Sequence, residues 1–147
     1  MSLIDELYLR PMAPSDEGFV VVSWCAELAR GTKIEGMERD DVFNLYRPHV
    51  LRHFSDGRLV RVVACDVRRP EQIVGFLVAR PSADILFNLH VKGDFRGQRV
   101  ATWMLESAGM SRRLTVASDT RDARRIRDEH PRTWTLRIDP TILVTEF

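Results

Sequence analysis

Short blocks of apolar residues follow one another along the chain, and the spacing within each block predicts an element. Alternation of apolar and polar residues predicts a strand, whereas recurrence every three or four residues after a polar cap predicts a helix. We therefore expect strands over residues 7–12, 59–67, 73–79, 85–92, 114–117, 134–138 and 142–146, and helices over residues 15–31, 40–54, 100–108 and 120–130.

Proline and turn residues mark where these elements should bend or end. The helix over 40–54 is capped by Asp40 or Asp41, and Pro48 should kink or restart it because proline lacks the amide that a helix needs. Residues 68–72 should form a five-residue hairpin loop. The mixed order of strands and helices predicts an α+β fold, with one sheet and helices on both faces.

Length and charge narrow the classes of function. A chain of 147 residues, 44% hydrophobic, suits a single domain over residues 1–147. It has 22 basic and 21 acidic residues, and this balance makes nucleic acid an improbable partner. All but two of the basic residues are arginine, which codon bias explains as well as function does.

The cysteines and the lengths of the apolar runs indicate where in the cell the protein is expected. Cys25 and Cys65 lie in apolar surroundings and without metal-ligand spacing, so we expect both to be buried, reduced core residues. The sequence has neither a signal-peptide pattern nor an apolar run of membrane length. A cytoplasmic location without a membrane partner is therefore expected.

The segment from Leu89 to Ala101 is the most informative one for chemistry. It predicts a strand that runs through a small-residue turn into a helix. Such a turn directs unpaired backbone N–H groups at one point, where the helix dipole adds partial positive charge, and a pyrophosphate fits there. Arg96 and Arg99 could add charge-assisted hydrogen bonds to phosphate oxygens.

This segment resembles the GCN5-related N-acetyltransferase (GNAT) superfamily, whose motif reads L-x-V-x-P-x-[YF]-R-G-x-G-[IV]-[GA]. The matching residues are Leu89, Val91, Phe95, Arg96, Gly97, Val100 and Ala101. The predicted order of elements resembles that family from end to end, as does the strand around Gly75. The resemblance implies a GNAT fold with a single central mixed, mostly antiparallel sheet.

The resemblance also implies acetyl-CoA as co-substrate, with no metal. The loop would hold the pyrophosphate, and the pantetheine arm would enter where the fourth strand parts from the fifth. The Val91 N–H would stabilise the tetrahedral oxyanion. The residues expected at this cofactor site are Leu89, Val91, Phe95, Arg96, Gly97, Gln98, Arg99, Val100, Ala101 and Thr102.

Three positions depart from the family pattern. Arg99 replaces the second glycine of the loop, where a side chain crowds the approach of backbone to phosphate. The usual acidic base would fall at Phe87 or Asn88, and the usual tyrosine near Arg127. Neither Phe87 nor Asn88 can take a proton, and the proton-donor role of the tyrosine is unfilled near Arg127.

His90 is the remaining candidate for a general base, with Asn88 beside it. We expect one apolar face of the strand, formed by Ile85, Phe87, Leu89 and Val91. Asn88 and His90 then lie on the other face and line a cleft. Histidine titrates in the range needed to deprotonate an amine. A partly exposed histidine without a catalytic role fits the pattern equally well.

Other polar groups have simpler explanations beside functional ones. His49 and His53 share a helical face but lack a third metal ligand. The arginines of residues 112–132 form a solvated helix face, or Arg124 or Arg125 reaches the 3′-phosphate of CoA. The acidic residues over 35–41 form a solvated loop or attract a cationic amine.

Two classes of function therefore remain. The first is an acetyl-CoA-dependent N-acetyltransferase, in which a primary amine of a small molecule or protein attacks the thioester directly in a ternary complex. The second is a GNAT-fold module without catalysis, used for structure, assembly or regulation, as in acetyltransferase-like phage proteins. Nucleic-acid binding is the weaker third reading. The sequence leaves the acceptor and a homodimeric state open.

Overall fold

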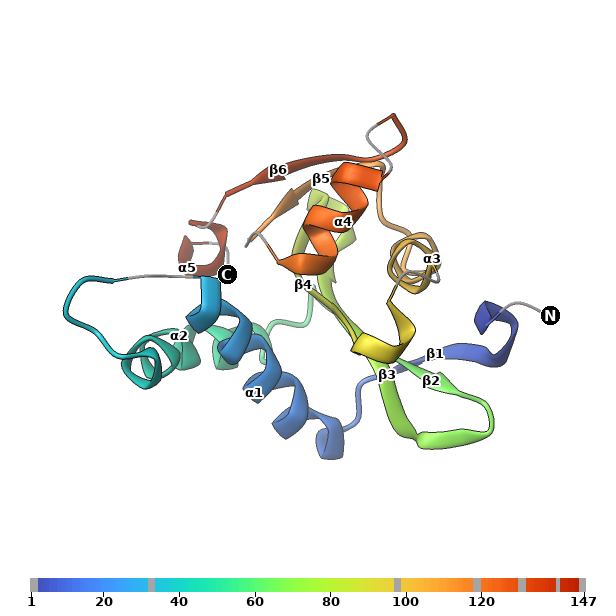
Figure 1. Cartoon of the computed structure of the whole chain (residues 1–147), viewed down its shortest axis with the longest axis horizontal. Coiled ribbons are helices and arrows are strands. Elements are labelled where there is room, and N and C mark those ends of the chain that lie inside the picture. The colour runs from blue at the N-terminus through green and yellow to red at the C-terminus, as the bar shows by residue number, and fades with distance from the viewer. Residues whose placement is uncertain are drawn as a thin grey trace.

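The computed structural model describes residues 3–31, 34–96, 99–117, 120–129, 132–139 and 141–145. Within these residues six strands form one sheet in the order β1-β2-β3-β4-β5-β6 (Figure 1). The strands are β1 (Leu7–Pro11), β2 (Val60–Asp66), β3 (Arg69–Arg80), β4 (Ile85–Val91), β5 (Arg113–Val116) and β6 (Thr135–Ile138). The helices are α1 (Pro14–Gly31), α2 (Arg39–His53), α3 (Val100–Ser107), α4 (Arg121–Glu129) and α5 (Ile142–Thr145), with short 3-10 helices η1 (Leu3–Glu6), η2 (Pro81–Ala83) and η3 (Gly93–Phe95).

The sheet is mixed and mostly antiparallel. Strands β1 to β4 pair antiparallel with their neighbours, whereas β4, β5 and β6 pair parallel. Helices α1, α2 and α5 contribute to the apolar cluster on one face, and α3 and α4 to the cluster on the other. The α+β architecture with helices on both faces is therefore confirmed.

Helix α1 is anchored to β1 by Asp16 in its first turn. The Asp16 carboxylate accepts hydrogen bonds from the Arg10 guanidinium at 2.6 Å and from the Ala13 N–H at 2.7 Å. The bond from Arg10 is the main cause that lowers the pKa of Asp16. A carboxylate at this end also favours the helix dipole, so the pair fixes where α1 begins over the sheet.

Strand β4 contains a bulge that corrects the expected single apolar face. Val78 pairs with Asn88, but the next residue of β3, Ala79, pairs with Leu86, so β4 carries one extra residue at Phe87. Residues two apart on either side of the bulge therefore lie on opposite faces of the sheet. Ile85 and Phe87 pack in the cluster with α1 and α2, whereas Leu89 and Val91 pack in the cluster with α3.

The hairpin and the C-terminal segment also differ from expectation. Strand β3 begins at Arg69, so the connection to β2 is the two-residue turn 67–68 and not a loop over 68–72. Helix α2 runs through Pro48 without restarting. The segment expected as a strand over 142–146 forms α5 instead. A run of three apolar residues is too short for its period to separate helix from strand.

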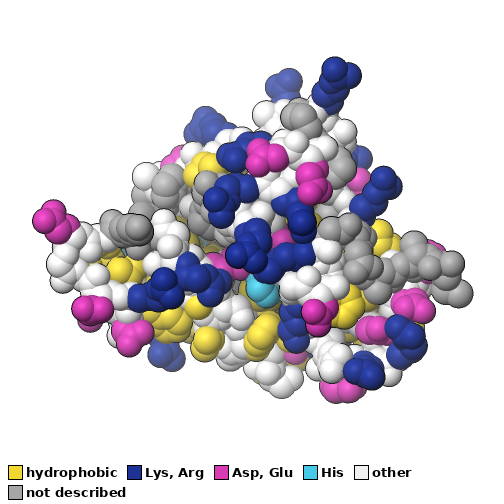
Figure 2. Space-filling model, in the orientation of Figure 1, with side chains coloured by type: hydrophobic (Ala, Val, Ile, Leu, Met, Phe, Trp, Pro, Cys, Tyr) yellow, Lys and Arg dark blue, Asp and Glu magenta, His cyan; other side chains and the backbone are white. Residues whose placement is uncertain are grey.

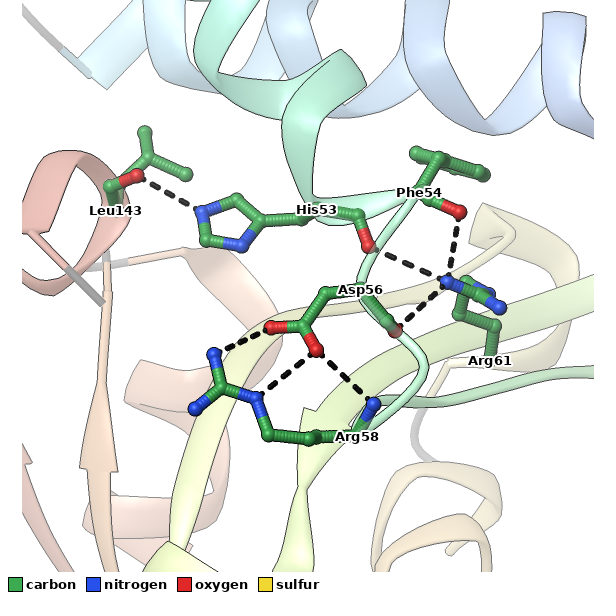
Figure 3. A network of polar contacts seen from close by, with 6 residues as sticks. All are labelled: His53, Phe54, Asp56, Arg58, Arg61 and Leu143. Carbon is green, nitrogen blue, oxygen red and sulfur yellow. Dashed lines mark hydrogen bonds and ion pairs between the residues drawn. The ribbon is translucent and has the colours of Figure 1, made fainter. Parts of the chain in front are cut away.

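Two polar contacts explain why this last segment is helical. The Asp139 carboxylate accepts hydrogen bonds from the Thr141 N–H and hydroxyl, which turns the chain before α5. His53, at the end of α2, donates its Nε2–H to the Leu143 carbonyl at 2.8 Å (Figure 3).

The C-terminus of α2 is held by Arg61, whose guanidinium donates hydrogen bonds to the carbonyls of His53, Phe54 and Asp56 (Figure 3).

Both cysteines are free and buried, as expected, and burial raises the pKa of each thiol. In the part of the chain that the structure describes, none of the helices has the length and apolarity to cross a membrane.

The buried His53 ring should make stability depend on pH. Burial lowers the pKa of His53 from its ordinary value of 6.5, so the unfolded chain takes up this proton before the folded chain does. The contribution of the neutral ring to the free energy of unfolding is therefore complete above that value and declines as the pH falls below it.

We expect the parent protein to lose more stability between about pH 7.5 and about pH 5.5 than His53→Gln loses, because glutamine does not titrate. Urea unfolding of both proteins at the two pH values measures the difference. Equal losses in parent and variant would contradict the assignment.

Candidate active site

Strands β4 and β5 part from each other after a short paired segment. The described pairs are Ile85 with Thr115 and Leu86 with Val116, followed by a bond from the Ala117 N–H to the Leu86 carbonyl. Strand β4 continues to Val91, well past this pairing. Parallel strands that diverge leave backbone N–H groups that need other acceptors. The parting of these strands was implied by the GNAT resemblance.

Asp122, in the first turn of α4, lies against this opening. Its side chain is 3% exposed, and its Oδ2 accepts a hydrogen bond from the Val91 N–H at 3.0 Å. The Arg96 Nε lies 3.4 Å from Oδ1. Burial raises the pKa of Asp122, against the opposing effects of the Val91 N–H and the Arg96 charge. Asp122 thus takes the place that a neighbouring strand leaves empty.

His90 lies on the opposite side of β4 and is held by Glu27 of α1. The His90 Nδ1 is 2.8 Å from the Glu27 Oε1, and the ring stacks on Phe76 with centroids 5.2 Å apart. A carboxylate on Nδ1 favours the tautomer with its proton on Nδ1. The Nε2 atom of His90 is then the acceptor that can take a proton from a substrate.

Glu27, His90 and Asp122 form one cluster, each offering a ligand atom within 4.8 Å of the others. Such a set could bind a divalent cation. However, Arg96 already balances the charge of Asp122, and arginines line the cavity beside Glu27. These positive charges disfavour a second cation, so proton transfer is the chemistry that fits the cluster better.

A cavity of about 140 Å³ lies between α3 and α4 and contains much of the sequence motif. The predicted site residues on its wall are Val91, Phe95, Arg96, Arg99, Val100, Ala101 and Thr102. Asp122, Arg125, Ile126 and Glu129 complete the lining from α4. Leu89 is buried in the core cluster beside α3 and does not line this cavity. Gly97 and Gln98 lie outside the described residues.

Arg99 occupies the N-cap of α3 with a left-handed backbone, at φ 64°. Glycine adopts this conformation without strain, whereas other residues are disfavoured by about 1 kcal/mol. This is the position at which the family motif has its second glycine. The arginine side chain is exposed and lines the cavity.

A second cavity of about 480 Å³ lies between the C-terminal end of α1 and the N-terminal end of α4. Its lining comprises Glu27, Arg30, Gly31, Arg96, Thr120, Arg121 and Arg124. Figure 2 shows Lys and Arg side chains gathered on the face where α1 and α4 approach each other in Figure 1. Arg96 lines both cavities, and Glu27 connects the second cavity to His90.

Asn88 does not line either of these cavities. Its side chain is 2% exposed, and its Oδ1 and Nδ2 atoms have no hydrogen-bond partner among the described residues. The expectation that Asn88 lines a cleft together with His90 is therefore not met at these two cavities. Its catalytic role finds no support in these contacts.

Of the other charged residues considered from the sequence, some line the two cavities and others only pair with neighbouring residues. Arg124 lines the second cavity and Arg125 the first, where Arg125 also pairs with Glu129 at 3.1 Å. Arg127 pairs with Asp128 at 3.2 Å. In the acidic stretch before α2, Glu38 and Asp41 form a capping box, which gives these two side chains a structural role.

Sequence reasoning missed Glu27 and Asp122. Glu27 lies three residues after the buried Trp24, so it borders the apolar stripe of α1, which is a weak signal for an inward-facing carboxylate. Asp122 resembles any acidic residue in the first turn of a helix. Their partners are 63 and 31 residues away along the chain, so only the tertiary structure brings them together.

Comparisons with known proteins found solved structures of low similarity only. No family model matches the sequence, and no curated protein matches it either. A GCN5-related N-acetyltransferase from Rhodopseudomonas palustris is 19% identical, over 69% of this chain and 64% of its own, with a TM-score of 0.47. The PaiA N-acetyltransferase from Thermoplasma acidophilum, in complex with coenzyme A, is 13% identical over 69% of each chain, with a TM-score of 0.49.

A spermidine N-acetyltransferase from Vibrio cholerae, in complex with CoA and spermine, is 15% identical, over 71% of this chain and 62% of its own, with a TM-score of 0.44. The chain thus covers less than two thirds of the Rhodopseudomonas and Vibrio proteins. All three structures are below 25% identity to this chain and have TM-scores below 0.5.

Gly75 of β3 controls how closely β4 approaches at His90. A Cβ atom at Gly75 would lie 2.5 Å from the His90 carbonyl oxygen and 3.3 Å from the Met104 Sδ. We expect Gly75→Ala to reduce the free energy of unfolding by about 1 to 3 kcal/mol, because the strands must separate. Gly18→Ala is the matched control, since a Cβ there, in the second turn of α1, has nothing within 4 Å. It should stabilise the helix by up to about 1 kcal/mol.

Urea unfolding measures both changes. A Gly75→Ala protein as stable as the parent would show that β3 and β4 are not held this closely.

Proposed function

We propose that the protein is an acetyl-CoA-dependent N-acetyltransferase in which a primary amine attacks the thioester directly in a ternary complex. The observation that carries the proposal is the position of the His90–Glu27 pair. It lies at the parting of β4 and β5, with one cavity on the α3 side of the strand and another between α1 and α4. A thioester and an amine can therefore approach the same point from two sides.

The first cavity supplies what a CoA pyrophosphate needs. The first turn of α3 directs amide N–H groups into it, as any helix N-terminus does. Arg96, Arg99 and Arg125 line the same cavity and can neutralise phosphate charge. The pantetheine arm would follow β4 toward Val91, where the strand has no neighbour in the described part of β5.

The reaction requires one proton acceptor and one anion-stabilising group. With its Nδ1 proton held by Glu27, His90 takes a proton from the ammonium group at Nε2. The amine nitrogen then bonds to the thioester carbon, and the carbon–sulfur bond breaks to release the CoA thiolate. The nitrogen gives up its second proton, which neutralises the thiolate, and the first proton passes from His90 to solvent.

The oxyanion role expected of the Val91 N–H needs a correction. In this structure that N–H donates to the Asp122 Oδ2 and is not free. Binding of the thioester must displace Asp122 before the amide can stabilise an oxyanion. Protonation of Asp122 weakens it as an acceptor, so its raised pKa favours this exchange.

The same contact supports a second candidate function. A carboxylate that occupies the amide at the expected thioester position, together with the strained Arg99 at the loop, fits a GNAT-fold module without catalysis. Turnover with an amine panel separates the two candidates.

His90 is the residue on which the catalytic proposal depends. We expect His90→Gln to lower kcat/KM by about a hundredfold or more, and to remove the acidic limb of the pH profile. Glu27→Gln should give a smaller loss, because it frees the ring but leaves the base. His49→Gln on α2 is the control. An unchanged rate and pH profile in His90→Gln, with CoA binding intact, would assign proton transfer to another group.

Arg99 tests the phosphate site. We expect Arg99→Ala to raise the Kd of CoA about 5- to 30-fold, because a charge-assisted hydrogen bond is lost, whereas Arg132→Ala should leave the Kd unchanged. Calorimetric titration with CoA gives both values. Tighter binding by Arg99→Gly than by the parent would show instead that the arginine obstructs the loop.

A further inference from the structure

We propose, on the basis of the function proposed above, that the acceptor amine carries an anionic group, a carboxylate or a phosphate, which the arginines of the second cavity bind. This cavity, of about 480 Å³, is lined by Arg30, Arg96, Arg121 and Arg124 against the single carboxylate of Glu27. Its volume suits a small molecule. The cavity is positively charged, whereas a site that binds a polyamine needs negative charge.

The arginines come from three separate parts of the chain. Arg30 is in the last turn of α1, Arg121 and Arg124 are in the first turn of α4, and Arg96 follows η3. Helical periodicity on one element therefore does not explain the cluster. Guanidinium groups that converge on one cavity repel each other, and an anion that binds between them removes that cost.

Two of these guanidinium groups are available for a ligand. Among the described residues, Arg30 and Arg121 form no ion pair, and both side chains are exposed at the cavity. Arg96 is engaged with Asp122 at 3.4 Å. Guanidinium groups bind carboxylate and phosphate through paired hydrogen bonds, so Arg30 and Arg121 can act as the two sides of a clamp.

The second cavity extends to the proposed catalytic pair, so it can hold an acceptor amine as well as an anion. Glu27 lines the cavity, and its Oε1 lies 2.8 Å from the His90 Nδ1. A molecule whose anionic end binds Arg30 and Arg121 therefore has its other end directed toward the Glu27–His90 pair. The ammonium group at that end is attracted by Glu27 and loses its proton to His90.

Two carboxylates of the acidic stretch before α2 already have structural partners. Glu38 and Asp41 satisfy the first turn of α2 through their capping box. The charged side chains that line the second cavity are four arginines and one carboxylate, so a polycation is repelled there.

The test compares acceptors with and without an anionic group. The pairs are 4-aminobutanoate with 4-aminobutanamide, and O-phosphoethanolamine with ethanolamine, with spermidine as the polycation. Release of CoA from acetyl-CoA gives kcat/KM for each. We expect the anionic member of at least one pair to be preferred about tenfold or more. The pair with the larger ratio identifies carboxylate or phosphate as the group.

The double variant Arg30→Gln/Arg121→Gln should reduce this ratio to about one. Arg132→Gln, which removes one exposed charge after α4, is the control and should keep the ratio. Equal rates for anionic and neutral amines, or spermidine as the best acceptor, would overturn the inference while the acetyltransferase proposal stands. So would a double variant that weakens CoA binding without changing the ratio, because its arginines would then serve the CoA phosphates.

A binding measurement keeps the inference testable without turnover. Calorimetry with CoA-saturated protein should detect 4-aminobutanoate or O-phosphoethanolamine in the parent, and neither in the double variant. This result with no turnover would support the anion site and reject catalysis. Failure of the parent to bind either compound would overturn the inference.

Discussion

The extra residue in β4 is the constraint on which the site depends. Without the bulge at Phe87, the alternation of the strand would place His90 on the face opposite to Phe87. With it, Phe87 stays in the core beneath α1 and α2, and His90 reaches Glu27 of α1. Leu89 and Val91 then pack toward α3. One inserted residue thus sets which cavity each group of β4 contacts.

The parting of β4 and β5 creates a second requirement, which Asp122 meets. A buried N–H without an acceptor costs about 1 to 3 kcal/mol, and a buried carboxylate without a partner costs more. The contacts of Asp122 with the Val91 N–H and with Arg96 satisfy both groups together. Because these contacts occupy the expected oxyanion donor, ligand binding at this point must replace them with interactions of comparable strength. The same feature therefore stabilises the free protein and opposes the entry of a thioester.

The fold was accessible from sequence where local patterns decide structure. The loop before α3 was recognised because a small-residue turn between a strand and a helix is a local feature, and the cavity there contains most of its predicted residues. The β4 bulge was missed because apolar residues continue on both faces of a buried strand, so alternation gives no warning. Glu27 and Asp122 were missed because their partners are distant in sequence, and α5 because its short apolar run has no decisive period.

The central claim is that the end of β4 and the start of α3 form one acetyl-CoA site, with Val91 released from Asp122 on binding. Titration of isotope-labelled protein with acetyl-CoA, followed by backbone amide NMR, tests this claim directly. We expect saturable shifts of the amides of Val91, Phe95 and Thr102, while Val22, exposed on α1, stays unchanged. A Val91 amide that does not move while the α3 amides saturate would contradict the release from Asp122. No shift in any of the three would contradict the site itself.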